Sequence, residues 1–182
     1  MLSDAECEKE RRTLTIREIR LYGDPVLTTR ASEITEFDES LEVLAQDMLE
    51  TMDAAGGVGL AANQIGLLKR IFVYDCSHTE SGMRGVIINP VWEAVGEKTQ
   101  TGIEGCLSIP DISTPTIRYE TVKVSGQDVQ GHPISMVVSG LMARCVQHET
   151  DHLDGVLFLS RLDSDERKQA MAQIRNSDWF NK

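Results

Sequence analysis

The sequence predicts a single domain of the α+β class. Segments typical of strands follow one another between residues 70 and 138, whereas segments typical of helices lie before and after them, at 40–55, 141–153 and 164–176. This order differs from the strict alternation of strands and helices that builds a parallel sheet. A chain of this length can bury roughly 70% of its unfolded surface without disulfide bonds. We therefore expect one domain over residues 14–182.

Charge and composition limit the partners of this chain. The formal net charge of −11 argues against tight binding to nucleic acids, whose phosphates require clustered lysine and arginine. Residues 1–13 mix acidic and basic side chains without the apolar core of a signal peptide, so we expect a flexible segment at the start of a cytoplasmic protein. No run approaches the roughly 18 apolar residues of a membrane span.

The first predicted helix covers residues 40–55. Its apolar residues recur three or four positions apart and define one helix face: Leu41, Leu44, Met48 and Met52. Asp38 or Ser40 can cap its start, and two glycines at 56–57 end it.

Residues 57–66 form a run of small side chains that bears one polar amide, Gln64. Such a run is typical of a flexible loop, or of a segment whose backbone lies close to a ligand. It lacks the Lys-Ser/Thr pair and the GxGxxG spacing of phosphate-binding loops, which argues against a nucleotide site.

The strands are predicted from β-branched and aromatic residues between turn signals. They cover residues 70–76, 85–90 with a continuation to 95, 118–126 and 129–138. We expect residues 96–101 to turn, and Gln127-Asp128 to link the last two strands as a hairpin. The final helix begins near Ser164, where Asp163 or Ser164 can cap it and Glu166 can complete a capping box.

The predicted helix at 141–153 carries the main functional signal, His148-Glu149-Thr150-Asp151-His152. Four-residue spacing puts both imidazoles on one helix face, where both can bind one metal ion. In a His-Glu-x-x-His motif the glutamate accepts a proton from water whose pKa the ion lowers to about 7. The alternative is a solvated helix face with locally bonded histidines, and a third ligand would decide between the two.

Several residues are candidates for that third ligand. Phe158 occupies the position where one metalloprotease pattern has its third histidine, and Glu166 remains a downstream carboxylate. Upstream, Cys106 is flanked by glycine, while Cys145 lies three residues before the first histidine. Binding by both cysteines and both histidines would make a closed structural zinc site, which would leave Glu149 without a task.

Three segments together resemble the signature motifs of the peptide deformylase family. They are residues 57–64 (GVGLAANQ), 104–108 (EGCLS) and 148–152 (HETDH). They occur in the family's order, and the resemblance extends from about residue 16 to 162. It implies antiparallel sheets packed around a central helix that carries the His-Glu-x-x-His motif, with a further helix at the C-terminus of the single catalytic domain.

The resemblance also implies an activity and assigns roles. The family removes formate from the N-formylmethionine of nascent polypeptides. The implied metal ligands are Cys106, His148 and His152. The implied general acid/base is Glu149, and the implied oxyanion donors are the Gln64 amide and the Leu107 N–H. The carbonyl of Gly59 would meet the substrate amide. The methionine pocket would be lined by Val58, Leu141, Cys145 and the aliphatic stem of Arg144.

The expected cofactor is one divalent metal ion. A Cys-His-His site accepts Zn²⁺, Ni²⁺, Co²⁺ and Fe²⁺, and the resemblance implies Fe²⁺ in the cell. The expected partners are N-formylmethionyl peptides and nascent chains, with transient ribosome association. Two alternatives stay open: a metallopeptidase that uses the same motif, and a noncatalytic binding module stabilised by metal.

Overall fold

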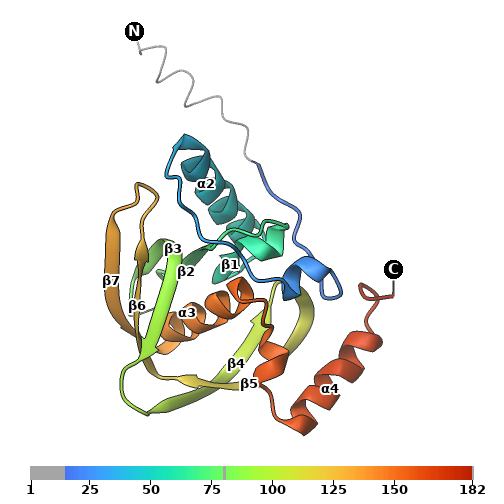
Figure 1. Ribbon diagram of the computed structural model, residues 1–182. Coiled ribbons are helices and arrows are strands. Elements are labelled where there is room, and N and C mark those ends of the chain that lie inside the picture. The colour runs from blue at the N-terminus through green and yellow to red at the C-terminus, as the bar shows by residue number, and fades with distance from the viewer. Residues whose placement is uncertain (1–14, 80, 182) are drawn as a thin grey trace.

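The computed structural model describes residues 15–79 and 81–181, so the expected flexible segment 1–13 lies outside the described residues. Two antiparallel sheets form the framework (Figure 1). The larger has the strand order β1-β2-β3-β6-β7. Its strands are β1 (Gly59–Ala61), β2 (Ile71–Cys76), β3 (Met83–Ala94), β6 (Thr121–Gln127) and β7 (Pro133–Ser139). The smaller sheet is a hairpin of β4 (Thr99–Cys106) and β5 (Ile109–Tyr119).

The helices cover these sheets. They are α2 (Glu39–Ala54), α3 (Gly140–Leu153) and α4 (Ser164–Arg175), with short 3₁₀ helices η1 (Pro25–Thr28), η2 (Ala62–Ile65) and η3 (Phe158–Arg161). Helix α3 lies between the larger sheet and the β4–β5 hairpin, and it contacts strands of both (Figure 1). The predicted α+β fold with a central helix and a C-terminal helix is confirmed.

Strand β2 of the larger sheet is buried on both faces. In β2, Ile71 and Val73 pack with the buried residues of α2, whereas Phe72 and Tyr74 pack with those of α3. This alternation follows from the two-residue period of a strand. Because both faces are covered, β2 has apolar side chains on successive residues and forms a continuous apolar run.

Helix α3 is buried from Met142 to Leu153, although many of its residues are polar. Gln147 shows how this burial is compensated. Its Oε1 accepts the Tyr119 N–H at 3.0 Å, and its Nε2 donates to the carbonyls of Tyr119 and Ala143 at 2.9 Å. Polar side chains on α3 therefore bind neighbouring elements instead of solvent.

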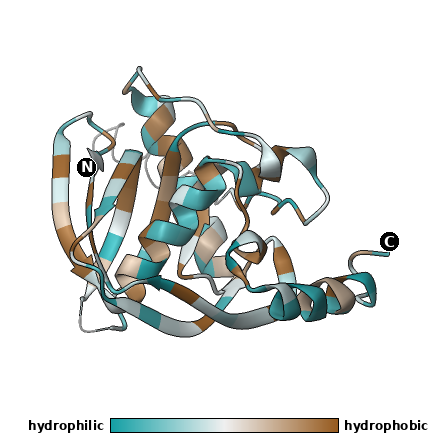
Figure 2. Cartoon of the chain, turned by 60° about the horizontal axis from the view of Figure 1, so that its bottom comes forward, coloured by the Kyte–Doolittle hydropathy of each residue, from teal (hydrophilic) through white to brown (hydrophobic). Residues whose placement is uncertain are grey.

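Helix α4 is amphipathic and covers the hairpin from outside. Most of its length is hydrophilic (Figure 2), but Ala170 and Ile174 are buried against Ile109 of β5 and Phe158 of η3. The Asp163 side chain caps its start by accepting two backbone N–H groups. Asp38 caps α2 in the same way, through the Leu41 N–H.

Several local predictions were wrong. Residues 99–101 begin β4 and not a turn, and the whole β4–β5 hairpin was missed. Arg118 lies in β5, so β6 begins only at Thr121. The hairpin loop between β6 and β7 spans residues 128–132, where the Asp128 carboxylate accepts two backbone N–H groups. Residues 59–65, expected as loop, form β1 and η2.

The failure to predict the β4–β5 hairpin has a physical origin. Strands β4 and β5 contain glycine and proline, and their exposed face carries Ile103 and Ile117, so their hydropathy does not alternate as a half-buried strand requires.

Among the described residues, no helix combines the length and the apolar character needed to cross a membrane.

Candidate active site

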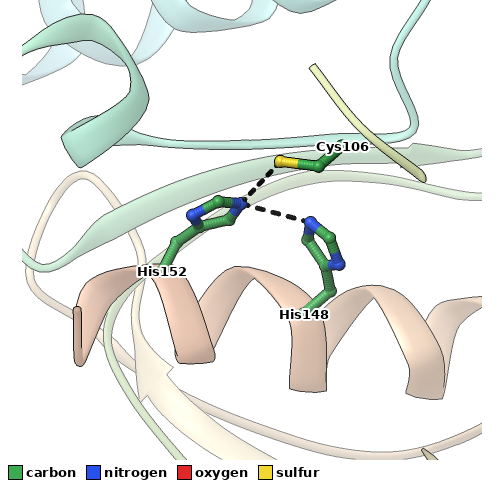
Figure 3. Close-up of side chains that lie close together, drawn as sticks. All are labelled: Cys106, His148 and His152. Atoms are coloured by element: carbon green, nitrogen blue, oxygen red, sulfur yellow. Dashed lines mark hydrogen bonds between the residues drawn. The ribbon is translucent and has the colours of Figure 1, made fainter. Parts of the chain in front are cut away.

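Three side chains that can bind a metal ion converge where α3 meets the end of β4. His148 and His152 project from one face of α3, and Cys106 is the last residue of β4 (Figure 3). The Cys106 Sγ lies 3.2 Å from the His152 Nε2, which lies 3.2 Å from the His148 Nε2. All three donor atoms lie within 4.8 Å of one another. One sulfur and two imidazole nitrogens suit a transition-metal site with a position open for water or substrate.

Glu104 orients the first of these histidines. Its Oε1 lies 2.7 Å from the His148 Nδ1, so Nε2 is left to face the other donors. Arg118 donates to both oxygens of this carboxylate at 2.6 and 3.1 Å, and Arg144 donates to Oε2 at 2.7 Å. Burial disfavours the charged carboxylate, but hydrogen bonds from His148 and Arg118 outweigh it and hold the Glu104 pKa below its usual value.

The charges around Glu104 continue as a buried network. Arg118 donates to the Asp151 carboxylate at 2.6 Å, and Asp151 accepts two further bonds from Arg161 at 2.6 and 3.1 Å. Arg118 and Asp151 are 5% and 6% exposed. Buried charges of this kind are tolerated only when they are paired and hydrogen-bonded. The network therefore joins β4, β5, α3 and η3 next to the cluster of Cys106, His148 and His152.

The two imidazoles differ in their affinity for protons. Burial lowers the pKa of His152 well below its usual value, which favours the neutral ring that binds a metal. Burial acts in the same direction on His148, but hydrogen bonds with Cys106 and Glu104 outweigh it and raise its pKa. A metal ion at the His148 Nε2 would replace the proton, because metal binding displaces protons from its ligands.

Glu149 is the carboxylate beside these donors. It is 4% exposed, and its Oε2 has no hydrogen-bond partner among the residues that the structure describes. Burial raises its pKa to about 7, although the nearby charge of His148 opposes this shift. A Cβ on residue 59 would collide with the Glu149 carboxylate and lie 2.9 Å from the Cys145 Sγ. Gly59 is therefore required for the close approach of β1 to α3.

Gln64 belongs to η2 and is 1% exposed. Its Oε1 accepts the Ala61 N–H at 2.9 Å, which fixes the orientation of the amide. Its Nε2 then faces the β4–β5 turn, 3.2 Å from the Ser108 Oγ and 3.6 Å from the Cys106 Sγ. A buried amide donor thus points at the place where the metal-binding side chains meet.

These groups open into a cavity of about 670 Å³, a size typical of small-molecule sites. The predicted site residues that line it are Val58, Gly59, Gln64, Cys106, Leu107, Leu141, Arg144, Cys145, His148 and Glu149. His152 is the one predicted site residue that is not in the cavity wall. The Arg144 guanidinium is held by Glu104 and by the Thr116 carbonyl at 2.9 Å, so its charge is compensated within the wall.

The geometry separates the candidates for the third ligand. Among the described residues, Cys106 joins the two histidines in one cluster of potential ligands. The Cys145 Sγ instead lies 3.7 Å from the Val58 carbonyl. Glu166 lies in the first turn of α4 and belongs to the capped helix start, and Phe158 stacks on the His148 ring with centroids 6.0 Å apart.

Sequence reasoning missed the supporting residues of the site. Glu104 belongs to the motif that carries Cys106, but no pattern in the sequence assigned it a role of its own. No sequence motif marks Arg118, whose partners lie 14 and 33 residues away, or Arg161, which binds Asp151 ten residues before it. Asp151 also lies inside a recognised motif, and nothing in that motif specified its role in the network.

The donor set, the buried Glu149 carboxylate and the adjoining cavity define a class of protein, the metal-dependent hydrolases with a His-Glu-x-x-His helix. Comparison with known proteins narrows the class. The family model described as polypeptide deformylase matches residues 16–168. Peptide deformylase 1 of Corynebacterium efficiens is 67% identical over 93% of this chain and 100% of its own length, and that of Corynebacterium glutamicum is 65% identical over the same shares.

Solved structures agree with this match. The peptide deformylase of Thermus thermophilus superposes with a TM-score of 0.80 at 43% identity, covering 88% of this chain and 93% of its own. That of Synechococcus elongatus, in complex with actinonin, gives 0.82 at 37% identity over 91% of each chain. The chain belongs to the peptide deformylase family, and it is a metal-dependent hydrolase that removes the N-formyl group from nascent peptides. The predicted family and activity are confirmed.

Replacing Glu104 by glutamine should weaken metal binding. The amide keeps the shape but loses the charge that orients His148, and a change of this kind next to a ligand typically lowers metal affinity about 10- to 100-fold. Titration of the metal-free variant with Zn²⁺ in a competing chelator measures this directly.

The matched control is Asp53→Asn, which removes a carboxylate from an exposed pair with Arg84. We expect its metal affinity to equal that of the wild type. Unchanged affinity in Glu104→Gln would contradict the orienting role of this carboxylate.

Proposed function

We propose that Cys106, His148 and His152 hold one divalent metal ion, and that the side chains around it carry out deformylation. The observation that carries this proposal is the convergence of three potential metal-binding atoms beside the buried carboxylate of Glu149, whose Oε2 has no hydrogen-bond partner among the described residues. An ion bound there would activate water by lowering its pKa and would polarise the formyl oxygen.

Glu149 acts as the general acid/base. Its pKa of about 7 suits a group that takes up a proton from attacking water and gives it to the leaving amine near neutral pH. Its Oε2 is free of competing hydrogen bonds among the described residues, so it can face the reacting groups. A carboxylate in this role must stay off the metal.

Gln64 and the Leu107 backbone N–H stabilise the negative charge that develops on the formyl oxygen. Gln64 supports this role because its Oε1 is fixed by the Ala61 N–H and its donor end points toward Cys106. A donor fixed in advance stabilises the transition state more than the substrate.

The cavity holds the N-terminal methionine side chain. Val58, Leu141 and Cys145 supply apolar and sulfur surface, and the stem of Arg144 completes the wall, since its charged end is already bound to Glu104. The carbonyl of Gly59 would accept the substrate N–H. Small or apolar walls of this kind favour an unbranched apolar side chain.

The ion in the cell is Fe²⁺, as the family resemblance implies, although the donor set also accepts Zn²⁺, Ni²⁺ and Co²⁺. Contact with the ribosome is transient. The substrate is a nascent chain, but a net charge of −11 opposes lasting contact with RNA phosphate.

Changing Glu149 to glutamine should abolish most turnover and spare the metal. With formyl-Met-Ala as substrate, we expect the wild type to release formate and leave the peptide bond intact. In the variant, kcat should fall by about 10²- to 10⁴-fold, the usual contribution of a general acid/base. Formate release and metal content are measured on the same samples.

Glu93→Gln, at an exposed site on β3, is the control for this variant. Loss of metal in parallel with activity would make Glu149 a ligand. Cleavage of the Met-Ala bond by the wild type would indicate a metallopeptidase, and metal binding without turnover would indicate a binding module.

Gln64→Leu removes the amide donor at similar size. We expect kcat to fall by about 10²- to 10³-fold, with KM within a few-fold of wild type. The melting temperature should also fall, because the buried Ala61 N–H loses its acceptor. Steady-state kinetics and thermal melts at fixed metal content test this.

Ser108→Ala provides the comparison, since it removes a partner of the Gln64 amide but leaves the donor. The alternative is that Gln64 only stabilises its own loop through hydrogen bonds. In that case both variants should raise KM and lower the melting temperature, while kcat stays near that of the wild type.

Enzyme prepared in air should lose activity with time. The Cys106 side chain borders the cavity, so both the sulfur and an Fe²⁺ ion are accessible to oxidants. Anaerobic preparation, or substitution by Ni²⁺, should preserve activity in a time-course assay. Equal, air-stable activity of the enzyme with the metal as isolated would argue against iron as the native metal.

A further inference from the structure

The turn that carries Cys106 leaves the regular hairpin ladder. Gly105 of β4 pairs with Ser113 of β5, but the next residue, Cys106, pairs with Ile109. Residues 110–112 therefore have no partner on β4. This bulge lies beside the metal-binding sulfur, and its backbone groups must find partners elsewhere.

The bulge is also conformationally restricted. Asp111, at its centre, has a φ of 64°, a conformation that residues with a side chain adopt rarely. Pro110, the first residue of the bulge, has no N–H of its own and can only accept a hydrogen bond. Contacts from other elements must keep this backbone in place.

One such contact comes from the C-terminal segment. The indole Nε1 of Trp179 donates to the Pro110 carbonyl at 3.1 Å. Trp179 and Cys106 are both partly buried against the same apolar cluster, which includes Ile109 and Ile174. The segment after α4 thus reaches the turn through a hydrogen bond and through apolar packing.

The segment is itself well anchored. The Ser177 Oγ donates to the Ile174 carbonyl at 2.6 Å, and the Asn181 side chain donates to the carbonyls of Arg175 and Ser177 at 2.9 and 3.0 Å. These bonds fold the segment back on the end of α4 and fix the position from which the indole approaches Pro110. The match to the family model covers residues 16–168, so it includes Pro110 but not Trp179.

We propose that Trp179 is a positioning residue, whose indole N–H holds the bulge at Pro110 so that the turn presents the Cys106 sulfur and the Leu107 N–H to the metal site. The inference rests on the proposed role of Cys106 as a ligand. Without the indole hydrogen bond, the turn samples more conformations. The Cys106 sulfur then lies close to His148 and His152 for a smaller fraction of the time, so the metal is released faster.

Trp179→Phe tests this, because phenylalanine keeps an aromatic ring and lacks the N–H. In the full chain loaded with Ni²⁺, we expect release to excess EDTA to be about two- to tenfold faster than in the wild type, the range that one hydrogen bond can supply. Amide hydrogen exchange should accelerate in residues 106–113 and stay unchanged in α2. In the Co²⁺-loaded variant, the thiolate-to-cobalt charge-transfer band should be weaker.

Phe180→Leu is the matched control. Phe180 lies next in the chain and packs on the rings of Tyr22 and Trp179, but no hydrogen bond links its side chain to Pro110. We expect metal release and the cobalt band to match those of the wild type. Equal changes in metal release in both variants would overturn the positioning role. Faster amide hydrogen exchange over the whole protein would do the same. Either result would show that the C-terminal segment only stabilises the protein in general.

The cobalt spectrum separates this inference from the proposed function. A wild-type band that is unchanged in Trp179→Phe would overturn the positioning role alone. The absence of any thiolate band in the wild type would show that Cys106 is not a ligand, and both proposals would fail.

Discussion

The pairing of Glu104 with two arginines and His148 is the interaction on which the site depends. Two arginines and one histidine surround a carboxylate that is 4% exposed. Removing a single partner from such a buried set is typically costly, by about 3–5 kcal/mol, since it leaves an uncompensated charge. The elements that supply these partners are therefore held in one relative arrangement, and that arrangement brings Cys106 to the histidines.

The same constraint explains why α3 can be both polar and central. A helix between two sheets normally presents apolar residues on both sides. Here His148, Asp151 and Gln147 are accepted because each has a fixed partner on β4, β5 or an adjacent strand end. Buried polar networks of this kind rigidify a site when they are satisfied, and this rigidity holds the face of α3 that bears His148 and His152 in place.

Local patterns in the sequence predicted what depends on local geometry. The spacing of His148 and His152 placed them on one helix face, and the apolar period of α2 located that helix to within a residue or two at each end. The choice of Cys106 over Cys145 was different, because spacing left both open and only the family resemblance favoured one. The partners of Arg118 lie 14 and 33 residues away, and no local pattern specifies such a pairing.

The two glutamates near the site show how environment separates residues of one type. Glu104 has charged partners on both oxygens, and its pKa is held low, so it stays a fixed negative charge behind His148. Glu149 is equally buried but lacks a partner at Oε2 among the described residues, and its pKa rises to about 7. A fixed charge can orient a ligand but cannot exchange protons near neutral pH, whereas a carboxylate of the second kind can. Burial alone does not separate these roles, because both side chains are 4% exposed. The two roles are separated by Arg118 of β5 and Arg144 of α3, which both donate hydrogen bonds to Glu104.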